Sequence, residues 1–512
     1  MSDRDPQQPP LETIPTRIPG LDAILRGGFL RGGVYMVQGM PGAGKTILGN
    51  QLAFAHVAAG GRAVYLTMVS ESHARMLGHL RALSFYDGAV IGDALYYVSG
   101  FQTLEEDGLT GLLDITRQAV RDHGATLLII DGVATARELV GSDLGLRRFI
   151  QKLQLFLEAV GCTAVLLTRP TPDNAAAEHT MADGVIELRD ERSAVYAHRL
   201  LTVTKFRGKD MLRGDHSYML TDDGMVVYPR TDARYAIASP ELDGERSRML
   251  VGIPRLDEMM GRGLLTGTTT LLLGASGTGK TLLGLHFLAT GAREGQQGLH
   301  FGFYETPTRL ITVADRLGLG LGAAVAAGTI DVQWQPPVEQ ILDALAQRLL
   351  DTVERRRVRR LFIDGIDGFR QATLAPARFN RFLAALTNEL RARDVTTVMS
   401  LEIPEFYGPS ATNPIAGSAG LVENMLFLRS VELHSQLYRL ISIMKMREGE
   451  YDGAIREFRI TDRGIAVEDT FASAEAILTG VARSSSATAR DTATHTAVAS
   501  HEERHDDNHP DR

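Results

Sequence analysis

The sequence predicts an α/β fold made of two similar domains in tandem, each a mainly parallel β-sheet flanked by helices. Strand-like and helix-like segments alternate along the 512 residues. Two glycine-rich loops, each between a strand-like run and a helix-like segment, lie about half the chain apart. Other short segments recur at nearly the same separation. These observations together indicate two copies of one domain.

The two loops, 39–46 and 274–281, both match the pattern GxxxxGK[ST] in full. Because each loop joins a strand to a helix, the pattern is typical of a working phosphate-binding loop rather than of a glycine-rich turn with an exposed lysine. The flanking segments are the strand-like runs 34–38 and 270–273 and the helix-like segments 47–59 and 282–292.

In such a loop, glycines let backbone N–H groups turn toward a polyphosphate, and the following helix start adds partial positive charge. We expect the two lysines to reach the β- and γ-phosphates and the two threonines to bind Mg²⁺. The chain is therefore predicted to bind ATP with Mg²⁺ through Gly39, Gly42, Gly44, Lys45, Thr46, Gly274, Gly277, Gly279, Lys280 and Thr281.

The duplication extends beyond the loops. Lys205-Phe206-Arg207 returns as Lys445-Met446-Arg447, at a separation close to that of the loops. Length alone suggests roughly three domains, but the repeat favours two large ones. The predicted organisation is a disordered tail 1–13, a first domain 14–237, a linker 238–247, a second domain 248–480 and a disordered tail 481–512.

Composition is that of an ordinary globular protein, with 44% hydrophobic and 23% charged residues. No apolar run is long enough for a membrane span, and the first residues do not resemble a signal peptide. The single cysteine, Cys162, is interpreted as a buried thiol, which fits a cytoplasmic protein. Histidines 501, 505 and 509 would line one helical face, but a solvated tail is favoured over a metal site.

Two aspartates end buried strand-like runs and are predicted to hold a water molecule of the Mg²⁺ shell, the Walker B role. They are Asp131 after 127–130 and Asp364 after 361–363. Their carboxylates should face the ligand-binding edge of each sheet, which lies at the carboxyl ends of the strands. The alternative is an aspartate that merely begins a turn.

Hydrolysis also needs a base that orients water near the γ-phosphate. The predicted bases are Glu71, after the strand-like run 64–69, and Glu305, after the run 299–303. The alternative for both is a solvated glutamate at the start of a helix.

With these motifs, the chain resembles a known family, the KaiC group of RecA-like ATPases. The namesake of that family carries two such domains and runs a bacterial circadian oscillator. The most specific likeness runs from Lys445-Met446-Arg447 through 454–458 to Thr461-Asp462-Arg463-Gly464. The resemblance implies two RecA-like P-loop domains and a ring, most simply a hexamer. It also implies trans-acting residues that reach the neighbouring subunit's ATP, namely Lys205, Arg207, Lys445 and Arg447, with Arg199 and Arg439 as further interface arginines.

The chain departs from this family at two places. Where the family has two adjacent glutamates, the sequence has Ser70-Glu71 and Tyr304-Glu305, so slow hydrolysis is expected. Where the namesake has an adjacent Ser-Thr phosphorylation pair, the sequence has Ala419-Gly420, with Ser418 beside it. Autophosphorylation is therefore weakened as a hypothesis, although it is not excluded.

Three functions remain open. The leading one is a ring-forming ATPase whose nucleotide state signals to a protein partner. The second is a serine/threonine kinase that acts on itself or on a partner, since phosphoryl transfer uses the same loop, metal and acid. The third is a DNA-dependent ATPase, which a net charge of −8 and a pI of about 6.0 disfavour. The only dense basic run, 355–360, is interpreted as a solvated helix end.

Overall fold

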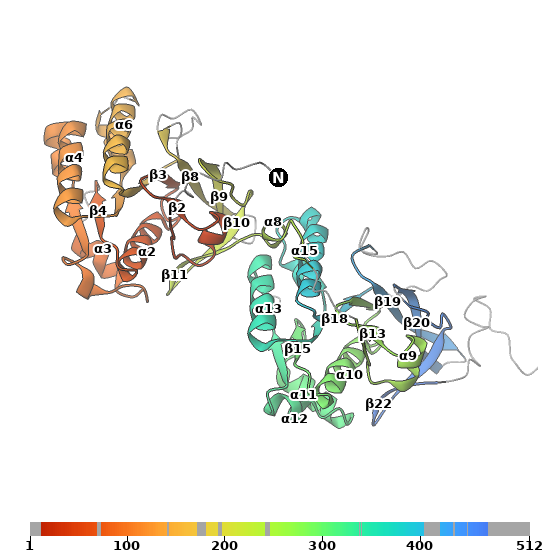
Figure 1. Cartoon of the computed structure of the whole chain (residues 1–512). Coiled ribbons are helices and arrows are strands. Elements are labelled where there is room, and N and C mark those ends of the chain that lie inside the picture. Colours follow the sequence, from red (N-terminus) through yellow and green to blue (C-terminus); the bar gives the residue numbers. More distant parts are fainter. Residues whose placement is uncertain are drawn as a thin grey trace, which may run out of the picture.

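The computed structural model describes residues 12–68, 73–140, 143–170, 181–192, 197–240, 246–336, 338, 340–403, 420–433, 436–447 and 449–468. The predicted C-terminal tail and the position of Ser418 lie outside this range, as does nearly all of the predicted N-terminal tail. The chain forms two lobes, each with a large twisted sheet between helices (Figure 1).

The sheet of the first lobe has nine strands in the order β11-β10-β9-β8-β3-β7-β6-β4-β5. The strands from β5 to β8 are parallel, and β8 to β11 form an antiparallel meander. Their bounds are β3 (Val34–Gly39), β4 (Ala63–Thr67), β5 (Leu95–Ser99), β6 (Leu127–Asp131), β7 (Thr163–Thr168), β8 (Gly184–Arg192), β9 (Ala197–Phe206), β10 (His216–Thr221) and β11 (Gly224–Tyr228).

The sheet of the second lobe repeats this arrangement in the order β16-β15-β17-β18-β14-β19-β20-β21-β22. Its strands match those of the first sheet one for one, so the predicted fold class is confirmed. Their bounds are β14 (Thr269–Gly274), β15 (Gly298–Gly302), β16 (Ile330–Trp334), β17 (Arg360–Asp364), β18 (Thr396–Glu402), β19 (Asn424–Leu433), β20 (Gln436–Met446), β21 (Arg456–Thr461) and β22 (Gly464–Val467).

A short two-stranded antiparallel sheet precedes each large one: β1 (Thr13–Ile14) with β2 (Phe29–Leu30), and β12 (Arg248–Met249) with β13 (Leu264–Leu265). The helices of the first lobe are α1 (Leu21–Ile24), α2 (Lys45–Ala58), α3 (His73–Leu80), α4 (Phe101–His123), α5 (Val133–Val140), α6 (Asp143–Val160) and α8 (Thr231–Arg234). Those of the second are α9 (Pro254–Met259), α10 (Lys280–Arg293), α11 (Pro307–Arg316), α12 (Leu321–Ala326), α13 (Leu342–Arg356), α14 (Asp367–Gln371) and α15 (Phe379–Ala392). Two 3₁₀ turns are η1 (Gly88–Val90) and η2 (Pro376–Arg378).

Each large sheet is buried on both faces, because alternate residues of its central strands enter different cores. In β4, Tyr65 packs with α2 on one face, whereas Val64 and Leu66 pack with α4 and α6 on the other. Cys162 belongs to the second of these cores, where burial raises the pKa of its thiol to about 12. The prediction of a buried thiol is therefore confirmed.

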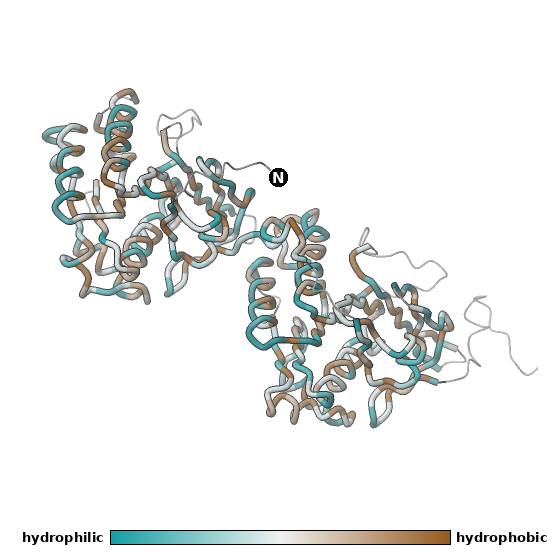
Figure 2. Tube along the Cα trace, viewed as in Figure 1, coloured by the Kyte–Doolittle hydropathy of each residue, from teal (hydrophilic) through white to brown (hydrophobic). Residues whose placement is uncertain are grey.

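Within the described residues, no helix is long and apolar enough to cross a membrane. Along the long helices, hydrophilic residues interrupt the hydrophobic ones, as α4 and α13 show in Figure 2.

The two lobes meet where α8 of the first lies against α13 and α15 of the second. The Asp343 carboxylate accepts hydrogen bonds from the Thr231 backbone N–H (2.8 Å) and hydroxyl (2.9 Å). Arg378 forms an ion pair with the same carboxylate and with Asp232 of α8, both at 2.6 Å. Arg378 thus pairs with Asp343 within its own lobe and with Asp232 across the contact, and this pairing offsets part of the cost of burying the charges.

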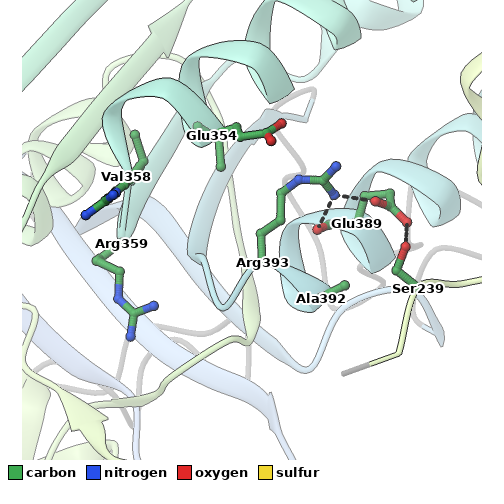
Figure 3. A pocket seen from close by; sticks show the side chains of 9 residues that line it. Ser239, Glu354, Val358, Arg359, Glu389, Ala392 and Arg393 are labelled. Carbon is green, nitrogen blue, oxygen red and sulfur yellow. Dashed lines mark hydrogen bonds and ion pairs between the residues drawn. The ribbon is translucent and has the colours of Figure 1, made fainter. Parts of the chain in front are cut away.

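A second contact lies further along, beside a cavity of about 540 Å³ between the C-terminal ends of α13 and α15. Figure 3 shows Ser239 donating a hydrogen bond to Glu389 (2.7 Å), which also accepts one from Arg393. The domain boundaries expected from the sequence remain predictions, but these contacts show that Thr231 and Ser239 both lie against the second lobe.

Candidate nucleotide-binding sites

Both predicted phosphate loops connect a central strand to a helix at the carboxyl edge of the sheet. The first joins β3 to α2, and the second joins β14 to α10. Two glycines of each loop have left-handed φ values: 86° and 90° at Gly42 and Gly44, and 75° and 100° at Gly277 and Gly279. This conformation turns successive N–H groups toward one point, which creates an anion-binding concavity.

The first glycine of each loop is required by a close neighbour. A Cβ atom on Gly39 would lie 2.8 Å from the Leu188 carbonyl oxygen on β8. On Gly274 it would lie 2.4 Å from the Leu428 carbonyl oxygen on β19. A side chain at either position would push the loop away from the sheet.

The loop lysines bend back over their own loops. Lys45 Nζ donates to the carbonyl oxygens of Gly39 (2.7 Å) and Met40 (3.1 Å). Lys280 makes the same pair of bonds in the second loop, at 2.8 and 2.7 Å. Burial lowers the pKa of both ammonium groups, and nearby carboxylates oppose that shift. Each amine therefore lies over the concavity where a phosphate would bind.

In the first lobe, the predicted metal-binding pair is brought together. Thr46 is the second residue of α2, and its hydroxyl donates to Asp131 Oδ2 at 3.0 Å. The Tyr65 hydroxyl donates to the same oxygen at 2.9 Å from β4. Asp131 is the last residue of β6 and is nearly buried, so its carboxylate is held in one orientation.

In the second lobe, Asp364 occupies the same place at the end of β17. Its Oδ1 accepts a hydrogen bond from the Ser400 hydroxyl at 2.7 Å, and His300 Nε2 lies 3.8 Å from Oδ2. Burial raises the pKa of this carboxyl group, but His300, Ser400 and Thr281 together outweigh burial and hold the pKa below its usual value. The carboxylate is therefore charged at neutral pH.

The side chains that contact these two acids, Tyr65, His300 and Ser400, were not predicted from the sequence. Tyr65 and His300 occupy the same position of equivalent strands, opposite Ile129 and Phe362. A polar ring within an otherwise apolar buried run was the available signal. Ser400 gave no such signal, because its contact with Asp364 depends on which strands are neighbours.

Of the two predicted bases, Glu305 lies among the described residues. Glu305 is half-buried between β15 and α11, at the carboxyl edge of the second sheet. Its neighbour Tyr304 is 54% exposed and lies over Gly365, where a Cβ atom would be 2.5 Å from the ring. This contact brings Tyr304 next to the Walker B position. Glu71 and Ser70 lie outside the described residues.

The Lys-x-Arg pairs lie at the opposite edge of each sheet from the loop of the same domain. Lys205 pairs with Val185, which pairs with Met36 in the first half of β3. Lys445 pairs with Met425, which pairs with Leu271 in the first half of β14. Arg207 and Arg447 follow directly after these strands, and their backbone N–H groups donate to the carbonyl oxygens of Asp183 and Glu423.

Arg199 and Arg439 lie at the other end of the same strands. Arg199 pairs with Asp190, beyond the point where Leu188 lies opposite Gly39. Arg439 pairs with Ser430 at the equivalent level. The structure thus separates these arginines from the Lys-x-Arg pairs and brings them to the loop edge of the sheet.

The basic run 355–360 is largely engaged in internal contacts. Arg360 is fully buried, lies over the Phe287 ring and forms a 2.7 Å ion pair with Glu294. Arg359 pairs with Asp394 at 2.6 Å, and Arg356 donates to the Gly328 carbonyl. These contacts disfavour a nucleic-acid surface. The interpretation as a solvated helix end holds only for the start of the run, because α13 ends at Arg356, and it is wrong for Arg360, which is buried at the start of β17.

The residues of both loops fit Mg²⁺. Magnesium in nucleotide sites is held by one or two protein oxygens together with substrate phosphates and water. A threonine hydroxyl beside a carboxylate supplies such oxygens in each lobe. Among the described residues, no cluster of three or more His, Cys, Asp or Glu side chains could hold a metal ion.

The fold and the two loops define a P-loop nucleotide-binding protein with duplicated RecA-like domains. The family model described as "ATPase: KaiC" matches residues 14–232 and 249–471. The chain therefore belongs to the KaiC ATPase family, as the sequence predicted.

Relatives named circadian clock oscillator protein KaiC are similar over almost the full length. That of Thermostichus vulcanus is 26% identical over 484 residues, covering 92% of both chains. That of Picosynechococcus sp. is 24% identical over 482 residues, again covering 92% of both. That of Synechococcus elongatus is 23% identical over 477 residues and covers 91% of both.

Proposed function

We propose that this chain is a ring-forming ATPase with two nucleotide sites, whose nucleotide state controls its interaction with a protein signalling partner. The observation that carries the proposal is the hydroxyl–carboxylate pair beside each glycine loop, such as Thr46 with Asp131 at 3.0 Å. A hydroxyl oxygen and a carboxylate oxygen next to a phosphate-binding loop are the protein ligands that Mg²⁺ bound to ATP prefers. Membership of the KaiC ATPase family supports the same chemistry.

In this proposal, Lys45 and Lys280 bind the β- and γ-phosphates, and Thr46, Asp131, Thr281 and Asp364 hold Mg²⁺ or its water. Bound Mg²⁺ would neutralise charge on the phosphates during transfer. Glu71 and Glu305 are proposed to orient the attacking water. Each domain offers one such glutamate, with Ser70 or Tyr304 at the neighbouring position, so slow hydrolysis is expected.

The position of the Lys-x-Arg pairs supports the proposal that the chain assembles into a ring. Lys205 and Lys445 lie level with the first half of the loop-bearing strand, whereas the phosphates would bind beyond its last residue. A residue at that edge is badly placed for its own site but can serve a neighbouring subunit. We propose this trans role for Lys205, Arg207, Lys445 and Arg447, with Arg199 and Arg439 as interface residues, most simply in a hexamer.

Native mass spectrometry with and without ATP tests assembly and binding together. We expect ATP-dependent rings with two nucleotides for each chain. Lys45→Ala and Lys280→Ala should each remove about half of the bound nucleotide. A chain that stays monomeric with saturating ATP would contradict the ring, and full occupancy in either variant would contradict the role of its lysine.

The same preparation separates hydrolysis from kinase activity. With ATP labelled in the γ-phosphate, hydrolysis should put the label in released phosphate rather than in protein. Stable incorporation into the chain would instead favour the kinase hypothesis. We propose no timekeeping role for this chain, because the positions matched to the phosphorylation pair carry Ala419 and Gly420.

A further inference from the structure

One strand of each sheet lies between the strand that leads into the glycine loop and the strand that ends in the Walker B acid. In the first lobe it is β7, between β3 and β6, and in the second it is β18, between β14 and β17. A residue at the carboxyl end of this middle strand is therefore flanked by the phosphate loop on one side and the acid on the other. The residue at this position has no assigned role in nucleotide binding or hydrolysis in either lobe.

The register fixes which residues these are. Glu402 pairs directly with Gly274, the first glycine of the second loop. In the first lobe Thr168 pairs with Gln38, so the next residue, Arg169, is level with Gly39. Both side chains are exposed at the edge where the phosphates would bind. Equivalent positions thus carry opposite charges.

The two charges act on the loop lysines in opposite directions. Burial is the main cause that lowers the pKa of Lys45, and Arg169 lowers it further. Burial also lowers the pKa of Lys280, but Glu402 is the strongest group that opposes this shift. Arg169 and Glu402 are therefore close enough to sense charge at the position of the lysine amine, which is where terminal phosphates would bind.

The other charged groups around the lysines widen the contrast. Lys45 is affected by one carboxylate, Asp131, as well as by Arg169. Lys280 is affected by Asp364 and Asp367 as well as by Glu402, which makes three carboxylates among the described residues. Asp367 begins α14, and the residue at the same distance from the acid in the first lobe is Ala134.

We propose that Arg169 and Glu402 set how strongly each site distinguishes ATP from ADP, so that the first site prefers ATP and the second discriminates less or prefers ADP. ATP differs from ADP by a γ-phosphate, which adds negative charge at this edge. A guanidinium there would bind that phosphate strongly, whereas a carboxylate would repel it. This inference rests on the proposed function, since it requires both sites to bind nucleotide.

The test uses the full-length chain and reads one site at a time. Lys280→Ala leaves the first site to be measured, and Lys45→Ala leaves the second. Affinities for ADP and for the non-hydrolysable ATP analogue adenylyl imidodiphosphate are measured by equilibrium titration with Mg²⁺. We expect Arg169→Gln to lower the ATP-analogue to ADP affinity ratio of the first site about tenfold, and Arg169→Glu about 100-fold.

The matched changes in the second lobe should act in the opposite direction. Glu402→Gln should raise the ratio about tenfold and Glu402→Arg about 100-fold, and both effects should shrink at high salt because exposed charges are screened. The glutamine variants keep the side-chain length and serve as neutral controls. Thermal unfolding checks that all variants fold.

The outcomes separate this inference from the proposed function. Parent chains that bind neither nucleotide would overturn the proposed function. Parent chains that bind both, with a ratio unchanged by charge reversal at one site, would overturn the role of Arg169 or Glu402 at that site.

Discussion

The two domains tie their last hairpin to the phosphate-loop helix with different side chains. In the first, Gln51 of α2 accepts a hydrogen bond from the Met225 N–H (2.8 Å) and donates to the Asp223 carbonyl (3.3 Å). In the second, His286 of α10 accepts from the Ile465 N–H through Nε2 at 2.9 Å. A neutral amide and a titratable ring thus hold equivalent hairpins, so only the second tie can depend on pH.

The His286 ring has fewer of its hydrogen-bonding groups paired than the Gln51 amide has. His286 is 4% exposed, and its Nδ1 has no hydrogen-bond partner within the described part of the chain. Because Nε2 accepts a hydrogen bond, the neutral ring carries its proton on Nδ1. Burial, with a smaller contribution from Arg293, lowers the pKa of His286 to about 4. The comparison indicates that, of these two hairpin contacts, the one made by His286 is sensitive to acid.

The largest expected effect tests whether the two halves also differ in catalysis. Glu71→Gln and Glu305→Gln should each slow hydrolysis at its own site by about 10²–10⁴-fold while nucleotide stays bound, because a general base is removed. Phosphate release is measured in each variant, with bound nucleotide counted by native mass spectrometry.

If only one variant loses turnover, the two sites differ in catalysis, and the glutamate replaced in the other variant is not a base. Unchanged release in the double variant would show that water is activated elsewhere. Ser70→Glu and Tyr304→Glu, which restore the family's pair of glutamates, should raise turnover.

The second-largest expected effect is a loss of stability at low pH, caused by protonation of His286. An unfolded histidine binds its proton near pH 6.5, whereas folded His286 does so only near pH 4. The contribution of His286 to the free energy of unfolding is therefore fully present above pH 6.5 and is lost as pH falls toward 4. The loss should reach about 3 kcal/mol. Hydrogen exchange at the 461–467 hairpin, followed from pH 7 to 4, measures it.

His286→Gln is the matched control, because it gives the second domain the side chain of the first. Its hairpin should keep its protection over this range, and we expect the same of the hairpin bound by Gln51. Equal pH dependence in the parent chain and in His286→Gln would contradict the assignment.

The smallest effect tests how closely each side chain lies against its hairpin. Gly224 and Gly464 both have left-handed φ values, near 90°. A Cβ atom would lie 2.6 Å from Gln51 Oε1 in the first case and 2.1 Å from His286 Nε2 in the second. Backbone strain of this kind costs about 1–3 kcal/mol. Gly464→Ala should therefore destabilise its domain more than Gly224→Ala, because the ring cannot move aside as an amide can.

Domain-resolved thermal unfolding measures the difference between these two alanine variants. Equal losses in the two variants would show that only backbone conformation matters at these glycines.

The parts of the site that the sequence predicted are those built from neighbouring residues. The two loops were recognisable because Gly39 to Thr46, and their repeat, form one continuous strand-loop-helix segment. Strand ends such as Asp131 were visible as the end of an apolar run. The parallel sheet followed from alternation of strand-like and helix-like segments.

The remaining features depend on strand order, which no local pattern encodes. Ser400 reaches Asp364 because β18 lies beside β17, and Arg169 lies beside the first loop because β7 separates β3 from β6. Likewise, Arg199 and Lys205 are close in sequence, but an extended strand carries them to opposite edges of the sheet. The charge contrast between the sites was therefore not predicted.

Cys162 gives the chain a practical advantage. It is the single cysteine, it is fully buried, and its high pKa keeps the sulfur as an unreactive thiol at neutral pH. Thiol-directed spectroscopic labels would therefore attach only to cysteines introduced by design, without first removing the native one. Exposed Leu155 of α6 and Leu437 of β20 are suitable positions, one in each domain, for following how the lobes move when nucleotide binds.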